Sequence, residues 1–154
     1  MSFRDTNKRE HGEYVTGRSG QVILFAARGP WNDETMKRGS IEMSEHIAAL
    51  DHPRPWAQIS CLHGESIMPP STFESFVKHT NIRKQIGLSK LAIAIIDSKI
   101  SLTIQAQLSE AYARTDVEHS FYSTTEAAME AISPIDYPHE QEVVRQFFAQ
   151  NAFL

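Results

Sequence analysis

The fold is decided by the stretch VILFAARGPWN, residues 22–32. Its first six residues are apolar at every position, which is typical of a central β-strand covered on both faces. Gly29-Pro30 then breaks the strand, and Asn32 or Asp33 can cap the helix that follows. Apolar residues recur at helical spacing after this cap, at Met36, Met43, Ile47 and Leu50. A buried strand that runs into an amphipathic helix is the repeating unit of an α/β fold.

The same unit recurs on both sides of this stretch. Upstream, residues 13–16 predict a short strand, joined to 22–27 by a turn at residues 17–20 whose glycines readily adopt positive φ. Downstream, further strands are predicted at residues 56–62, 91–97 and 117–122, and helices begin after each of them. The order β-β-α-β-α-β-α-β-α predicts an α/β fold with a mixed, mostly parallel sheet of about five strands and right-handed crossovers.

The chain divides into three segments. Residues 1–12 contain almost no apolar side chains and predict a flexible N-terminal tail, whereas residues 13–133 carry the alternating strands and helices. Pro134 and Pro138 mark a linker, so residues 134–154 are expected to form this linker and a C-terminal apolar helix. A length of 154 residues suits a single domain with a sizeable core.

Three local features accompany the element order: the turn GPWN at 29–32, the strand LAIAII at 91–96 and the junction FYSTTEA at 121–127. Together they resemble the STAS domains typified by bacterial anti-sigma-factor antagonists, and the related SpoIIAA-like family of uncharacterised proteins. The resemblance covers roughly residues 13–132. It implies a SpoIIAA-like fold and a regulatory role exerted through contact with another protein.

STAS domains that act as phospho-switches carry a serine or threonine after the third strand, in an Asp-Ser-Ser-Gly-like loop. The matching stretch here, residues 63–72, lacks that pattern and contains two prolines, but it offers Ser71 and Thr72 as candidates for phosphorylation. A phosphate at a helix N-terminus is stabilised by free backbone amides and the helix dipole. Ser71 and Glu74 also form a capping box, which explains the serine without any modification.

Ligands of α/β sheets tend to bind beyond the carboxyl ends of the strands. Two loops are expected there, and their candidate ligand or partner residues are Trp31, Asn32, His63, Glu65 and Ser66. An alternative interpretation is a small hydrolase or transferase that uses His63 and Glu65 beside Asn32. No G-x-S-x-G nucleophile motif follows a strand, so catalytic residues are not predicted.

Composition narrows the possible partners. The net charge of −4 and the scattered lysines and arginines argue against nucleic-acid binding. No two of the seven histidines are spaced i, i+4, and the glycines lack phosphate-loop spacing, so neither a metal nor a cofactor is expected.

The cysteine content and the lengths of the apolar segments bear on the cellular location. The single cysteine, Cys61, lies in an apolar run and is interpreted as a buried packing residue. No window has the roughly 20 apolar residues of a membrane span, and no signal peptide is visible. A cytoplasmic location is therefore expected.

The C-terminal helix carries the strongest apolar cluster outside the strands: Val143, Val144, Phe147 and Phe148. Such a face must be buried on its own domain, on a second copy of the chain or on another protein. These residues are therefore candidates for an interface. The sequence as a whole predicts a non-enzymatic binding or regulatory module that acts through protein contact or a small ligand, with a structural homodimer as a further alternative.

Overall fold

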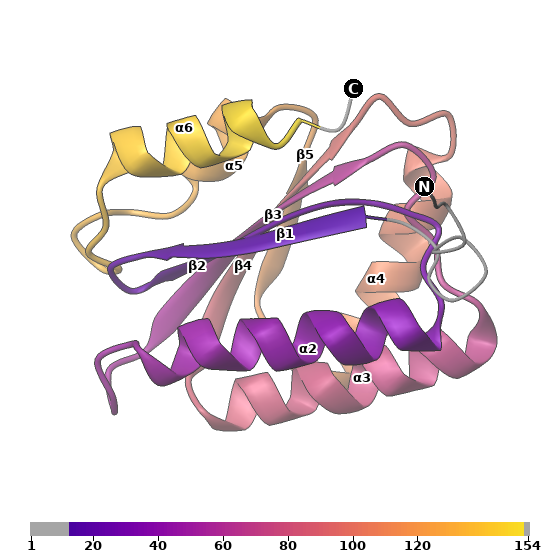
Figure 1. The fold of residues 1–154 in the computed structure, drawn as a ribbon, viewed down its shortest axis with the longest axis horizontal. Coiled ribbons are helices and arrows are strands. Elements are labelled where there is room, and N and C mark those ends of the chain that lie inside the picture. The colour runs from indigo at the N-terminus through magenta and orange to yellow at the C-terminus, as the bar shows by residue number, and fades with distance from the viewer. Residues whose placement is uncertain (1–12, 153–154) are drawn as a thin grey trace, which may run out of the picture.

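A five-stranded sheet runs through the centre of the molecule in the order β1-β2-β3-β4-β5 (Figure 1). The computed structural model describes residues 13–152, so the predicted N-terminal tail at 1–12 lies outside the described residues. The strands are β1 (Glu13–Ser19), β2 (Val22–Arg28), β3 (Trp56–His63), β4 (Leu88–Ile96) and β5 (His119–Tyr122). Only β1 is antiparallel to its neighbour; the remaining pairs are parallel. The predicted mixed, mostly parallel α/β sheet is confirmed.

Helices cover both faces of the sheet. The helices are α2 (Asp33–Ala48), α3 (Pro70–Gln85), α4 (Ser101–Thr115), α5 (Thr125–Glu130) and α6 (Gln141–Gln150). In Figure 1, α2 and α3 lie side by side on one face, where α4 also packs, and α5 and α6 lie on the other. Of the two predicted cap residues, Asn32 caps α2, because its side chain accepts the backbone N–H of Thr35 at 3.0 Å, and Asp33 lies in the first turn.

The central strand β3 divides its side chains between two separate cores, because alternate residues of a strand point to opposite faces. Ala57, Ile59 and Cys61 belong to the core beneath α5 and α6. Cys61 is buried there, in agreement with its interpretation as a packing residue, and burial raises the pKa of its thiol. Leu62 belongs to the core beneath α2, α3 and α4.

Two details of the sequence interpretation are wrong. Residues 17–19 belong to β1 rather than to the turn, which comprises Gly20 and Gln21. Gly17 is required in the strand because the ring of Phe147 packs against it, and a Cβ there would lie 2.8 Å from ring atom Cε1. Ser71 does not cap α3: this helix begins at Pro70, after Pro69, and has no side-chain cap.

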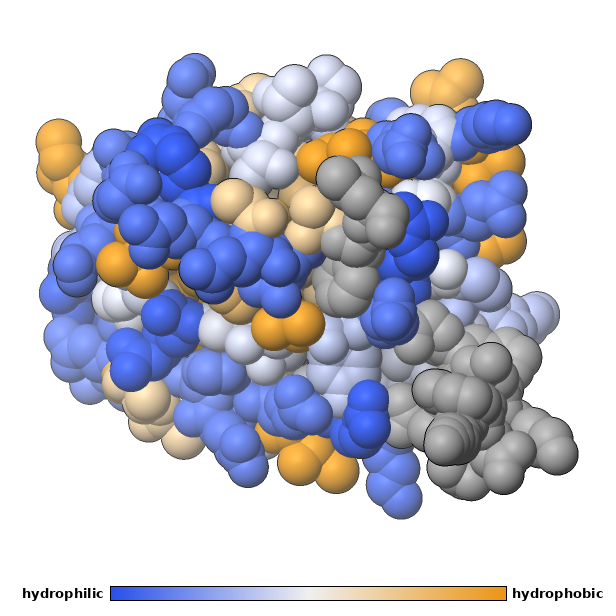
Figure 2. Space-filling model, turned by 45° about the horizontal axis from the view of Figure 1, so that its top comes forward, coloured by the Kyte–Doolittle hydropathy of each residue, from blue (hydrophilic) through white to orange (hydrophobic). Residues whose placement is uncertain are grey.

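Helix α6 docks on its own domain. Val144 and Phe148 are buried in the core beneath α5 and α6, whereas Val143 on the outer side of the helix is 43% exposed. Figure 2 shows that hydrophobic side chains on the visible face occur as separate patches among hydrophilic ones. Of the interface candidates, Val144 and Phe148 are therefore already covered within the chain.

None of the helices within residues 13–152 combines the length and the apolar character needed to cross a membrane.

Candidate functional site

The two loops expected to frame a site are in direct contact with each other. Ser66 Oγ accepts the backbone N–H of Gly29 at 3.1 Å and donates to the carbonyl of His63 at 2.9 Å. The backbone N–H of Trp31 donates to the carbonyl of Ile67 at 3.1 Å. A Cβ at Gly29 would lie only 2.6 Å from Ser66 Cα, so the loops approach as closely as a glycine allows.

The residues considered for catalysis have different environments, and His63 is the last residue of β3 rather than part of the loop. His63 is buried, and its pKa is lowered first by this burial and then by the positive charge of Arg28. Glu65 is exposed, and Asn32 uses its side-chain oxygen to cap α2. None of His63, Glu65 and Asn32 lines either of the two hollows described below.

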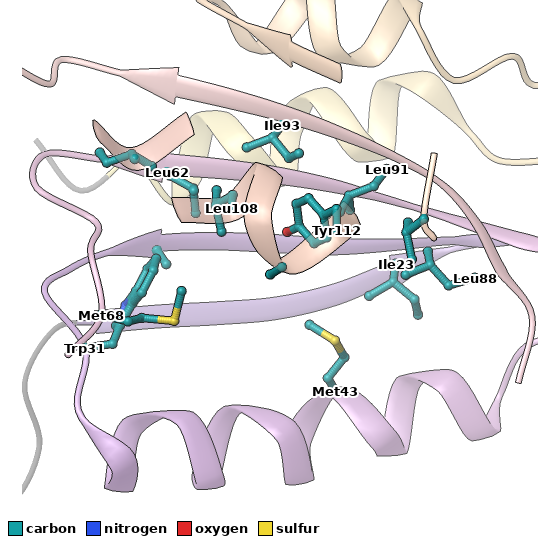
Figure 3. Close-up of a cluster of buried hydrophobic side chains, with 14 of the residues drawn as sticks. Ile23, Trp31, Met43, Leu62, Met68, Leu88, Leu91, Ile93, Leu108 and Tyr112 are labelled. Atoms are coloured by element: carbon teal, nitrogen blue, oxygen red, sulfur yellow. The ribbon is translucent and has the colours of Figure 1, made fainter. Parts of the chain in front are cut away.

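Trp31 instead lines a cavity of about 70 Å³ that lies between the sheet and helices α2, α3 and α4. We call it the inner cavity. Figure 3 shows Trp31, Met43, Leu108 and Tyr112 pointing into this region from the loop and the helices. Apolar side chains form most of its wall: Phe25, Trp31, Met36, Met43, Leu62, Phe76, Ile93 and Leu108. On the usual scale, such a volume holds several water molecules or a chemical group of similar size.

Polar side chains lie on the floor of this cavity, in the middle of the central strand. Gln58 and Ser60 are buried and point to the same face of β3, and Gln58 Nε2 donates to Ser60 Oγ at 2.9 Å. Within residues 13–152, Gln58 Oε1 and Trp31 Nε1 have no hydrogen-bond partner. Buried polar atoms are nearly always hydrogen-bonded in folded proteins, so this concentration beside a cavity is unusual.

Arg83 of α3 faces the same space. Its side chain is 9% exposed, and its Nη2 donates to Thr80 Oγ1 at 3.1 Å. Its guanidinium lies over the ring of Phe76, 5.9 Å from the centroid. Nε has no hydrogen-bond partner and no Asp or Glu of the described chain forms an ion pair with it. Burial consequently lowers the pKa of Arg83.

Tyr112 of α4 completes the polar part of the inner cavity. The residue is buried and lines the cavity together with Arg83. Burial raises the pKa of the Tyr112 phenol, and the charge of Arg83 partly opposes the rise, so the hydroxyl stays protonated and can donate.

A wider hollow of about 630 Å³ lies between the C-terminal halves of α2 and α3, hereafter the α2–α3 groove. Ser40, Met43 and Arg83 line both the groove and the inner cavity, so the two hollows adjoin. The apolar wall of the groove comprises Met43, Ile47, Ala48, Pro53, Ile82 and Ile86.

The phosphorylation candidates join α2 to α3 at the opposite ends of these helices. The hydroxyl of Thr72 donates to Asp33 Oδ1 at 2.6 Å, and that of Ser71 donates to both carboxylate oxygens at 3.2 Å. Thr72 is buried and Ser71 is exposed. A phosphate on either residue would therefore face a carboxylate, which opposes the favourable effect of the helix N-terminus.

The inner cavity was not predicted, although two signals for it exist in the sequence. Gln58 and Ser60 are polar at alternate positions of a strand that lies between two fully apolar strands, so both must point to one buried face. Arg83 follows Phe76 by seven residues and Thr80 by three, which places it on the inner side of its helix.

The fold has a counterpart among solved structures. The chain is similar to an uncharacterised protein of the DUF3478 family from Shewanella loihica PV-4, which is described as having a SpoIIAA-like fold. The TM-score is 0.56 at 14% sequence identity, and the match covers 80% of this chain and 95% of the other. No protein-family model matches the sequence, and no curated protein matches it. The chain therefore has a SpoIIAA-like fold, as the sequence resemblance implied.

Proposed function

We propose that the chain is a non-enzymatic binding module that holds a small ligand in the inner cavity. The observation that carries this proposal is a set of buried polar atoms around one cavity, on Trp31, Gln58 and Arg83, that have no hydrogen-bond partner among residues 13–152. Pockets for small molecules typically combine apolar walls with a few polar groups that orient the ligand.

The lining of the cavity supports binding rather than catalysis. None of the described residues that line it is an aspartate, glutamate, histidine, cysteine or lysine. General acid–base catalysis works best with a group whose pKa lies near the working pH, and neither arginine nor a buried tyrosine meets this condition. Helices α2 and α3 form part of the cavity wall, so a bound ligand would contact both of them. The SpoIIAA-like fold is in keeping with a regulatory use of such a ligand.

Indole N–H resonances in two-dimensional NMR test the proposal directly, because the chain has two tryptophans. Trp31 lines the cavity, whereas Trp56 Nε1 donates to the carbonyl of Ile86 at 3.0 Å and serves as an internal control for compounds short enough to stay within the inner cavity. Titration with small straight-chain alcohols, amines and carboxylic acids is expected to shift the Trp31 signal saturably and to leave that of Trp56 nearly unchanged.

A matched pair of variants at Gly39 tests whether the compounds bind in the inner cavity. Gly39 lines the cavity, and a Cβ there would lie 3.8 Å from the ring of Tyr14, an ordinary contact. Gly39→Ala should therefore keep binding, whereas Gly39→Leu should fill the space and abolish it. The proposal fails if no compound shifts Trp31 in the folded protein, or if Gly39→Leu binds as well as the unaltered chain.

A further inference from the structure

The inner cavity is lined by a buried cation, the guanidinium of Arg83. A buried charge is strongly disfavoured unless an opposite charge or a full set of hydrogen bonds compensates it. Arg83 has one side-chain hydrogen bond, to Thr80, and one aromatic contact, with Phe76. In the part of the chain that the structure describes, no carboxylate pairs with it, so its positive charge is not balanced by the protein.

We propose that the ligand of the inner cavity is an aliphatic monocarboxylate whose carboxylate pairs with Arg83. The inference rests on the proposed function and adds the chemical class of the ligand. Arg83 Nε is a free donor, and the hydroxyls of Ser60 and Tyr112 line the same space. Guanidinium and hydroxyl donors together suit a carboxylate, because hydrogen bonds to a charged acceptor are stronger than neutral ones.

The charge and the walls restrict the ligand further. One buried cation balances one negative charge, so a monocarboxylate fits better than a phosphate, which carries more charge at neutral pH. The rest of the cavity wall is apolar, which requires an apolar remainder of the ligand. A chain too long for about 70 Å³ can continue past Arg83 into the α2–α3 groove, where Ile47, Ile82 and Ile86 provide apolar contacts.

Binding of hexanoate and of hexan-1-ol, measured by calorimetry, separates charge recognition from simple apolar binding. Hexanoate is expected to bind at least about tenfold more tightly than the alcohol, which has the same carbon chain but no charge. Arg83→Met should remove this preference while keeping an apolar side chain of similar length. Lys78→Met is the matched control, since it removes an exposed positive charge from the same helix and should leave the preference unchanged.

The pairing of a carboxylate with Arg83 can also be measured in the unaltered chain, through the pKa of His79. His79 lines the α2–α3 groove, and its pKa is lowered by burial and then by the charges of Arg83 and Lys78. A carboxylate bound to Arg83 should cancel part of this field and raise the pKa of His79, measured by NMR of its ring protons. Saturating hexan-1-ol carries no charge and should not raise the pKa of His79.

The outcomes distinguish the two proposals. Equal affinity for hexanoate and hexan-1-ol, or an unchanged preference in folded Arg83→Met, overturns the carboxylate inference but leaves the binding module standing. Absence of binding by either compound, together with an unmoved Trp31 signal, overturns both. Should Arg83→Met fail to fold, the rise in the pKa of His79 with hexanoate and not with hexan-1-ol decides the question in the unaltered chain.

Discussion

The two faces of the sheet are built from the same strands but differ in what they bury. Beneath α5 and α6, the central strand contributes the apolar side chains of Ala57, Ile59 and Cys61 to the core. Beneath α2, α3 and α4, the same strand contributes Gln58 and Ser60, and the inner cavity lies above them. We call these the closed face and the open face. The open face combines the larger of the two apolar clusters with these buried polar groups, which is the composition of a binding site.

The largest expected effect comes from removing the aromatic anchor of the closed face. Phe148→Ala should lower the free energy of unfolding by about 3–5 kcal/mol, because it leaves a cavity beneath α6. Val143→Ala on the exposed side of the same helix should cost less than about 1 kcal/mol. Urea denaturation of both variants measures the difference. Similar losses would show that α6 contributes little to the closed face.

A pair of neighbouring substitutions compares the faces within one strand. Ile59→Gln should cost more than about 2 kcal/mol, because it buries an amide among apolar side chains. Gln58→Met on the open face should change the free energy of unfolding by less than about 1 kcal/mol, because it also removes an amide oxygen that has no partner within residues 13–152. Equal destabilisation in thermal or urea unfolding would contradict the distinction between the faces.

A smaller loss is expected where α2 and α3 are joined. Asp33→Ala should cost about 1–2 kcal/mol, because the buried hydroxyl of Thr72 loses its acceptor. Glu34→Ala, the adjacent exposed acid in the first turn of α2, removes the same charge without this contact and is the control. A result in which both variants lose equal stability would assign the effect to the helix dipole rather than to the contact between helices.

The smallest expected effect is a pH dependence at the end of β3. The pKa of His63 is lowered in the folded protein, so the unfolded chain binds a proton at a higher pH than the folded one does. The resulting stability is present above the ordinary histidine pKa of about 6.5 and is lost as the pH falls towards the lowered value. His63→Gln should therefore lose less stability than the unaltered chain between about pH 7 and pH 5. Identical pH slopes in chemical denaturation would show that His63 does not contribute.

The order of strands and helices along the chain could be predicted because it depends on local patterns. The continuous apolar runs of β2 and β4, and the cap at Asn32, act on neighbouring residues only. Gly17 and Ser71 were assigned wrongly because distant partners decide their roles: the ring of Phe147 packs on the glycine, and Asp33 accepts the serine hydroxyl.

The inner cavity depends entirely on such distant contacts. Gln58, Arg83 and Tyr112 come from three separate elements, and their meeting follows from how α3 and α4 pack on the sheet. His63 and Glu65 were candidates because the sequence places them directly after a predicted strand, but neither of them lines the cavity.

The unbalanced charge of Arg83 has a consequence for the lifetime of the protein in a cell. A ligand that binds only the folded state raises the free energy of unfolding in proportion to the logarithm of its concentration. Proteases act on the unfolded fraction, so a modest change in stability alters the amount of protein several-fold. If Arg83 is paired only when the proposed monocarboxylate is bound, the protein would accumulate when that ligand is abundant. It would be degraded when the ligand is scarce.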